Sequence, residues 1–189
     1  TARSQNLLSV VVTFDPHPLQ VLRPGGIKLI STVEQKIEQI GKAGIDHLVI
    51  LPFDREFAAT SAESFVQKIL RGAIGMSELV VGYDYAFGRG RSGDIVFLRR
   101  QGREYGFPVQ VVEALHRDGM LVSSTKIREL VSSGRMMDAR KLLGRPYQIR
   151  GVVQVGKKRG GTEIGFPTAN LQVNRDDLVP RIGVYVTQV

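Results

Sequence analysis

Side chains that could bind phosphate and a metal ion gather in one glycine-rich stretch near the end of the sequence. The run Gly156 to Gly161 (GKKRGG) is flexible and basic, and it precedes Gly165 to Asn170 (GFPTAN). Glycines let a backbone approach phosphate oxygens closely, and lysines neutralise the phosphate charge. The Thr168 hydroxyl and the Asn170 carbonyl are hard oxygen ligands that suit Mg²⁺. A basic hairpin tip touching solvent or nucleic acid fits this composition about as well.

A rigid turn near the start of the chain could present an imidazole. The apolar run LLSVVVTF is followed at once by Asp15, Pro16, His17 and Pro18. The two prolines fix the backbone, so His17 and the proline rings would be presented at little entropic cost. A structural turn with an exposed histidine is an equally good interpretation of this stretch alone.

Aromatic residues surround a carboxylate in a second turn. Tyr83, Tyr85 and Phe87 flank Asp84 and offer flat apolar surfaces that suit a planar aromatic ligand. Taken alone, packing in the core is the better interpretation, because most aromatic side chains are buried.

Hydroxyl side chains mark the start of a predicted helix further along. Ser123, Ser124 and Thr125 place hydroxyls and free backbone amides at a helix N-terminus, where geometry and dipole together favour phosphate. Arg128, one turn later, can add a permanent charge with bidentate reach. Plain N-capping explains the serines about as well.

The elements that must position these residues alternate between strands and helices. Capping signals at 31–34 and 60–63 precede amphipathic patterns, and helices are also predicted at 94–105, 123–133 and 136–143. Apolar runs of strand length lie at 7–14, 47–51, 78–81 and 109–112. This alternation predicts a doubly wound α/β domain, with a parallel sheet covered on both faces. Ligands bind such sheets outside the carboxyl ends of the strands, so the three loops should converge on one crevice.

The pattern changes near residues 144–147. From Tyr147 onward, alternating β segments follow one another without helices: YQIRGVVQVG, TANLQV and IGVYVTQV. We therefore expect an α/β domain over 1–145 and the beginning of an all-β domain over 146–189.

Composition limits the class of protein. The 189 residues are 42% hydrophobic and 23% charged, as in an ordinary globular protein. No membrane-spanning run, signal peptide or cysteine occurs, which predicts a soluble cytoplasmic protein. The net charge of +8 favours a polyanion, whether nucleic acid, acidic membrane or a phosphorylated small molecule.

Four motifs together make the sequence resemble a known family. The chain is similar, over nearly its whole length, to the bacterial bifunctional riboflavin kinase/FAD synthetases. The motifs that carry the resemblance, in order, are TFDPHP, VVGYDYAFGRGRSGD, VSSTKIREL with LLGRPY, and GFPTANL.

The resemblance implies an enzyme with two activities. A Rossmann-like nucleotidyltransferase domain (FMN adenylyltransferase) would join FMN to AMP, giving FAD and pyrophosphate. A riboflavin kinase β-barrel, of which residues 146–189 would be the N-terminal part, would phosphorylate riboflavin to FMN. Both reactions would use ATP and Mg²⁺, and neither a membrane nor a nucleic-acid partner is expected.

The resemblance also assigns roles to residues. Ser124, Thr125 and Arg128 resemble the triphosphate-binding signature and would be catalytic. Thr168 and Asn170 resemble the kinase's metal ligands. The flavin- and nucleotide-binding set would comprise Asp15, Pro16, His17, Pro18, Asp84, Phe87, Gly156, Lys157, Gly165 and Pro167.

Two departures from the family pattern shape a further expectation. The family's leading His-x-Gly-His segment has no counterpart here, and kinase strands with a catalytic carboxylate would be expected after Val189. The sequence is therefore interpreted as a fragment truncated at both ends. An alternative from another class is a non-catalytic basic protein that binds nucleotides or nucleic acid and reuses the fold.

Overall fold

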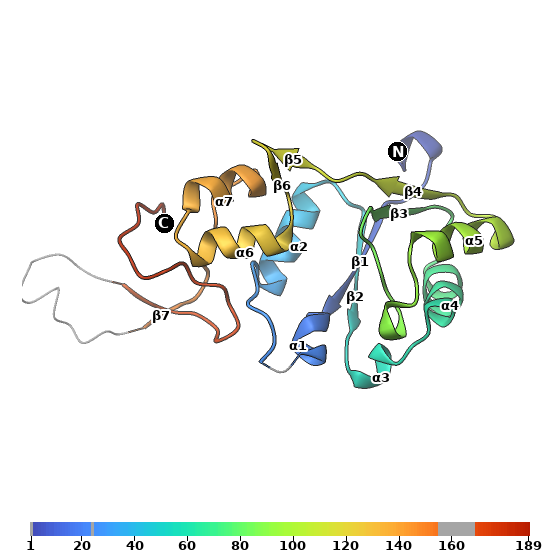
Figure 1. The fold of residues 1–189 in the computed structure, drawn as a ribbon, viewed down its shortest axis with the longest axis horizontal. Coiled ribbons are helices and arrows are strands. Elements are labelled where there is room, and N and C mark those ends of the chain that lie inside the picture. The colour runs from blue at the N-terminus through green and yellow to red at the C-terminus, as the bar shows by residue number, and fades with distance from the viewer. Residues whose placement is uncertain (1, 24, 155–168) are drawn as a thin grey trace, which may run out of the picture. The chain divides into compact units, whose positions relative to one another are not determined.

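The computed structural model describes residues 2–23, 25–154 and 169–189 (Figure 1). The chain forms two compact units, each assembled from separate stretches of sequence. The first unit comprises Thr1–Val11, Ile27–Leu48 and Arg117–Val189, and the second comprises Val12–Gly26 and Val49–His116.

Four strands supply the sheets of the second unit. β1 (Val10–Asp15) and β2 (His47–Pro52), which begin in the first unit and end in the second, pair with each other. β3 (Leu79–Gly82) and β4 (Val109–Val112) pair in parallel, with Leu79 opposite Val109. The parallel strands predicted from the sequence are thus present, but the described strands form two-stranded sheets rather than one continuous sheet.

Both sheets contribute to one hydrophobic core. Its buried residues come from helices, β3 and the loop before β4, and they are Phe65, Val66, Leu70, Val81, Leu98 and Phe107. Phe14 and Leu51 of the first sheet, and Leu79 and Val109 of the second, pack against them. Burial of these side chains is the main force that holds the second unit together.

The other face of the β3–β4 sheet is open. Successive strand residues point to opposite faces, so Val81 is buried while Val80 is 53% exposed and Val112 is 56% exposed. Within this unit the face that carries Val80 and Val112 is thus exposed, and a sheet covered on both faces stays a prediction.

The helices of the second unit are mostly short. They are α1 (Pro18–Leu22), α3 (Arg55–Ala58), α4 (Ala62–Ser64), its π-helical continuation η2 (Phe65–Ala73), the 3-10 turn η3 (Arg89–Arg91) and α5 (Ile95–Tyr105). The Ser61 hydroxyl caps α4 by accepting from the Ser64 amide at 3.1 Å, one residue later than the predicted cap.

The first unit contains the short 3-10 helix η1 (Arg3–Gln5), α2 (Val33–Lys42), α6 (Ser124–Ser132) and α7 (Met136–Leu143). A hairpin of β5 (His116–Arg117) and β6 (Met120–Leu121) leads into α6. The core consists of side chains from α6, α7 and one later residue: Ile127, Leu130, Val131, Ala139, Leu142 and Leu178.

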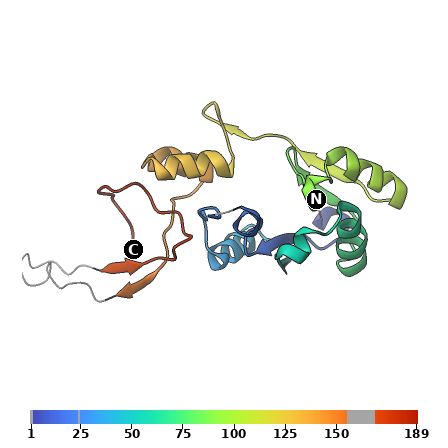
Figure 2. The same cartoon turned by 60° about the horizontal axis from the view of Figure 1, so that its bottom comes forward.

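The last part of the chain contains two paired strands. β7 (Val152–Gln154) and β8 (Asn170–Gln172) are antiparallel and lie side by side (Figure 2). The strand expected from IGVYVTQV is absent, and Ile182 and Val184 are fully exposed at 99% and 102%. A strand needs a hydrogen-bonded neighbour, and no described strand pairs with this segment.

None of the described helices is long and apolar enough to cross a membrane.

Candidate active site

The turn after β1 places the first group of predicted residues. Asp15 and Pro16 are exposed, whereas His17 and Pro18 are half-buried. His17 caps α1: its Nδ1 accepts from the Leu19 amide at 3.1 Å, and its own amide donates to Gln20 Oε1 at 3.1 Å. His17 thus has a structural role in this turn, although it is half-buried rather than exposed, and its binding role stays a prediction.

The turn after β3 places the second group. Asp84 and Tyr83 are exposed, with 43% of Tyr83 open to solvent. Tyr85 stacks on Phe87 with 5.3 Å between ring centroids, and burial raises the pKa of the Tyr85 hydroxyl. The turn therefore presents one carboxylate and one aromatic ring to solvent.

Phe87 is mainly a packing residue. Its ring lies 5.4 Å from that of Phe65 and 6.1 Å from that of Phe97, between centroids. Its backbone forms a two-way bridge with Gly93, at 2.9 and 3.0 Å. The core interpretation of this aromatic residue agrees with the structure, and its place in a flavin wall stays a prediction.

The N-terminus of α6 carries the third group. The Ser123 hydroxyl accepts from the Lys126 amide at 3.2 Å and so caps the helix. Ser124 and Thr125 are exposed in the first turn, where backbone amides have no partner within the helix. This is the arrangement that binds anionic oxygens at helix N-termini.

Arg128 lies one turn after these residues and is anchored at one nitrogen. Its Nε donates to the carbonyl of Lys28 at 2.8 Å. Burial lowers the pKa of the guanidinium, but an arginine stays charged at any physiological pH. Among the described residues, Nη1 and Nη2 make no hydrogen bond, so the forked end of the side chain is available to an anion.

The predicted residues fall into two sets. Ser124, Thr125 and Arg128 share one helix in the first unit. The turns after β1 and β3 both belong to the second unit, and Phe14 at the end of β1 and Phe87 in the second turn pack against its core. Convergence of all three on one crevice stays a prediction.

The glycine-rich loop lies mostly outside the described residues, including Gly156, Lys157, Gly165, Pro167 and Thr168. Asn170 is described as the exposed first residue of β8, opposite Gln154. In the described part of the chain, no cluster of three or more His, Asp or Glu side chains could hold a metal ion.

Comparison with known proteins identifies the family. A family model described as FAD synthetase matches residues 1–126, and one described as riboflavin kinase matches residues 143–189. The chain belongs to the riboflavin kinase/FAD synthetase family.

Relatives of known sequence agree with this assignment. The chain is 37% identical to a bifunctional riboflavin kinase/FMN adenylyltransferase of Listeria monocytogenes, over 99% of this chain and 59% of the relative. It is 35% identical to the enzyme of the same description from Escherichia coli K12, with the same coverage. The chain thus spans about three fifths of the length of these relatives.

A solved structure shares the fold. It is described as a macrolide-efflux protein from Streptococcus pneumoniae, and it is 31% identical with a TM-score of 0.85. The match covers 97% of this chain and 60% of that one.

Several residues outside the predicted set join the two family regions within the first unit. The buried amide of Gln35 in α2 donates to the Gln148 carbonyl at 3.3 Å. A further bond lies within the riboflavin kinase region, where Tyr147 donates from its hydroxyl to the Leu178 carbonyl at 2.7 Å. Tyr147 belongs to the motif LLGRPY, so it carried a family signal, whereas Gln35 and Lys28 carried none.

A small cavity lies among these contacts. It is lined by 29–32, Gln35, 147–150 and 177–178, and its volume is about 10 Å³. This is room for about one water molecule, far too little for a nucleotide or a flavin. The cavity is therefore a feature of the junction and not a substrate pocket.

Proposed function

We propose that this protein acts in flavin cofactor synthesis and catalyses two ATP-dependent reactions. The part matched by the FAD synthetase model would transfer AMP from ATP to the phosphate of FMN, which gives FAD and releases pyrophosphate. The part matched by the riboflavin kinase model would contribute to transfer of the terminal phosphoryl group of ATP to riboflavin, which gives FMN and ADP.

The observation that carries the proposal is the N-terminal turn of α6. Exposed Ser124 and Thr125 and the guanidinium of Arg128 lie on one helix that begins inside the FAD synthetase match. Nucleotidyl transfer depends mainly on positioned cations and donors around developing negative charge. Hydroxyls, free amides and an arginine anchored only at Nε supply such donors for the triphosphate.

The two turns of the second unit would form the flavin side of the site. Pro16 and Pro18 offer rigid apolar ring faces, and Asp84 with the exposed ring of Tyr83 offers a carboxylate beside an aromatic surface. His17 would hold this turn in place as the cap of α1.

The finer fold assignment belongs to this proposal. The adenylyltransferase domain would be a Rossmann-like nucleotidyltransferase over 1–145, and 146–189 would be the N-terminal part of a riboflavin kinase barrel. The parallel β3–β4 pair supports the first assignment, and the antiparallel β7–β8 pair supports the second.

Magnesium would be held mainly by oxygen atoms. Thr168 and Asn170 offer a hydroxyl and an amide carbonyl, which suit Mg²⁺ as ligand types, and substrate phosphates and water would complete its coordination. The bound ion would neutralise charge on the phosphates of ATP. Asn170 would orient toward it from the start of β8. A cytoplasmic location, with small molecules rather than nucleic acid as partners, is proposed from the family.

Arg128→Ala tests the proposal. In the protein that carries this sequence, we expect FAD formation from FMN and ATP to fall by about 100-fold or more, because the triphosphate loses a positioned cation. Arg140→Ala is the matched control, since it removes an exposed positive charge from the neighbouring helix α7. Riboflavin phosphorylation should change little in either variant. Unchanged FAD formation in a folded Arg128→Ala protein would contradict the proposed role of α6.

A further inference from the structure

Two segments far apart in the sequence are hydrogen-bonded within the first unit. The Leu29 amide donates to the Asp176 carbonyl at 2.8 Å, and the Leu178 amide donates to the Leu29 carbonyl at 2.8 Å. Leu29 lies in the FAD synthetase match, and Asp176 and Leu178 lie in the riboflavin kinase match. The two family regions are therefore joined by backbone pairing.

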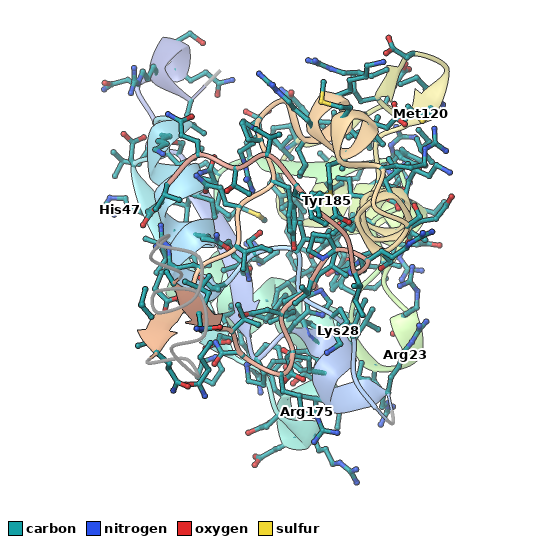
Figure 3. All side chains as sticks on the ribbon, turned by 90° about the vertical axis from the view of Figure 1, so that its left-hand side faces the viewer. Arg23, Lys28, His47, Met120, Arg175 and Tyr185 are labelled. Carbon is teal, nitrogen blue, oxygen red and sulfur yellow. The ribbon has the colours of Figure 1, made fainter. Side chains whose placement is uncertain are left out.

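Lys28 connects this junction to Arg128. Its Nζ donates to the carbonyl of Arg175, and its own carbonyl accepts from Arg128 Nε at 2.8 Å (Lys28 and Arg175 in Figure 3). A chain of two hydrogen bonds thus runs from the riboflavin kinase region through Lys28 to the arginine of α6.

Packing and charge hold the same junction from other sides. Leu178 is 4% exposed and lies in the core with Ile127 and Leu130 of α6. Arg150 and Glu38 form a two-pronged ion pair at 2.7 and 3.0 Å. The segment that receives the Lys28 side chain is therefore itself packed against α6 through Leu178, while Arg150 ties the start of the riboflavin kinase region to α2.

We infer that Lys28 is a positioning residue for Arg128, and that the riboflavin kinase region sets its place. The inference rests on the proposed function, in which Arg128 binds the triphosphate. A guanidinium tied at Nε has its Nη1–Nη2 fork oriented before the ligand arrives, so less freedom is lost on binding. Adenylyl transfer is thereby made dependent on the docking of the segment 175–178.

Pyrophosphate binding is the direct test, because pyrophosphate is a product that occupies the proposed anion site. Its affinity is to be measured by calorimetry for the unaltered protein, Lys28→Met, Lys28→Arg and Lys42→Met. Lys42→Met is the matched control, since it removes one exposed lysine charge from α2. We expect Lys28→Met to weaken binding roughly 5- to 10-fold, Lys28→Arg to restore most of it, and Lys42→Met to change it little.

A double-substitution cycle separates positioning from direct charge. If Lys28 acts through Arg128, Lys28→Met adds almost nothing in an Arg128→Met background. An equal loss in both backgrounds would show that Lys28 contacts the anion itself and would overturn the inference. An unchanged affinity of folded Lys28→Met would overturn it as well.

The same titration distinguishes failure of the underlying proposal. No pyrophosphate binding by the unaltered protein would overturn the anion site of α6, and the positioning role with it. Binding by the unaltered protein that is lost in Arg128→Met, but not weakened in Lys28→Met, would leave the proposed function standing and remove only the positioning role.

Discussion

Arg150 holds Glu38 with both ends of its guanidinium, Nη1 at 2.7 Å from Oε1 and Nη2 at 3.0 Å from Oε2. Glu38 lies on α2 in the FAD synthetase match and Arg150 in the riboflavin kinase match. The hydrogen bond from Arg150 is the main cause that lowers the pKa of Glu38. Two residues 112 positions apart thus identify α2 as a docking surface for the later part of the chain.

Reversing the charge of either residue alone should destabilise the protein, and reversing both together should restore most of the stability. Glu38→Arg places two like charges together, and Arg150→Glu does the same with the opposite sign, so each should lower the melting temperature. The double swap should recover most of the loss. Increasing salt should shrink all three effects, because both side chains are exposed. If the melting temperature of the double swap fell by the sum of the two single decreases, the ion pair would be contradicted.

Asp46 should contribute to acid sensitivity. The Ser9 hydroxyl donates to Asp46 Oδ2 at 2.6 Å and the Ser9 amide to the same oxygen at 2.8 Å, and these bonds lower the pKa of Asp46, the hydroxyl being the larger cause. The stability they supply is present above the ordinary pKa of 3.8 and is lost as the pH falls through the lowered value.

Thermal melts between about pH 5 and pH 2 check this prediction. In Asp46→Asn the melting temperature should fall less steeply as the pH is lowered. Ser9→Ala keeps the backbone hydrogen bond, so its effect on this slope should be smaller. A profile with the same acid slope in all three proteins would contradict the role of Asp46.

Tyr147 should titrate unusually late. Burial, with a smaller effect of the Asp177 charge, raises the pKa of its hydroxyl from 10.0 to about 12. The protonated form is the one that donates to Leu178, so this contribution to stability is full below about pH 10 and is lost as the pH rises through about 12.

Tyr147→Phe gives the measurement. We expect it to cost about 1 kcal/mol of unfolding free energy by chemical denaturation at neutral pH, because a half-buried hydrogen bond is lost. In an alkaline titration followed by tyrosinate absorbance, Tyr147→Phe should lack the part of the absorbance rise that occurs at the highest pH. If the variant instead lacked absorbance that rises near pH 10 in the unaltered protein, the raised pKa of Tyr147 would be contradicted.

Gly88 and Gly90 form a matched pair in the turn that follows Phe87. Both have a positive φ, +73° and +63°, so alanine is strained at either position. A Cβ at Gly88 would also lie 2.7 Å from the Ala62 nitrogen, whereas a Cβ at Gly90 would meet nothing within 4 Å.

The two substitutions should therefore differ in cost. Gly90→Ala should lower the unfolding free energy by about 1 kcal/mol, which is the cost of the conformation alone. Gly88→Ala should cost about 1 to 3 kcal/mol more, because the backbone at the start of α4 has to move. Equal effects in chemical denaturation would contradict the close approach.

The sequence predicts most elements of this fold because their signals are local. Helix α7 and strand β4 have the bounds expected from their apolar patterns, and α5 begins one residue later than expected, with Asp94 as its cap. The cap of α2 is Thr32, paired with Gln35, rather than the expected Ser31 with Glu34. Adjacent candidates with the same spacing cannot be ranked without the geometry of the turn. The β5–β6 hairpin was missed although Asp118-Gly119 carries a turn signal.

The contacts that organise the candidate site are much less predictable. Lys28 and Arg175 are 147 positions apart, and no periodicity or motif links them. The expected strand at 182–189 failed for a related reason: alternation shows which residues share a face, but strand formation needs a partner. Arg128 could be predicted because it lies in a family motif. Lys28, whose carbonyl accepts from it, lies in no motif and is found only from the structure.

The interleaved composition of the two units has a consequence for synthesis on the ribosome. The chain passes between units after residues 11, 26, 48 and 116, so the early stretches Thr1–Val11 and Ile27–Leu48 belong to a body whose remaining part starts only at Arg117. The second unit is fully translated by His116 and can fold while synthesis continues. Leu29 has to wait until Leu178 has left the exit tunnel, so completion of the first unit is a late, long-range closure.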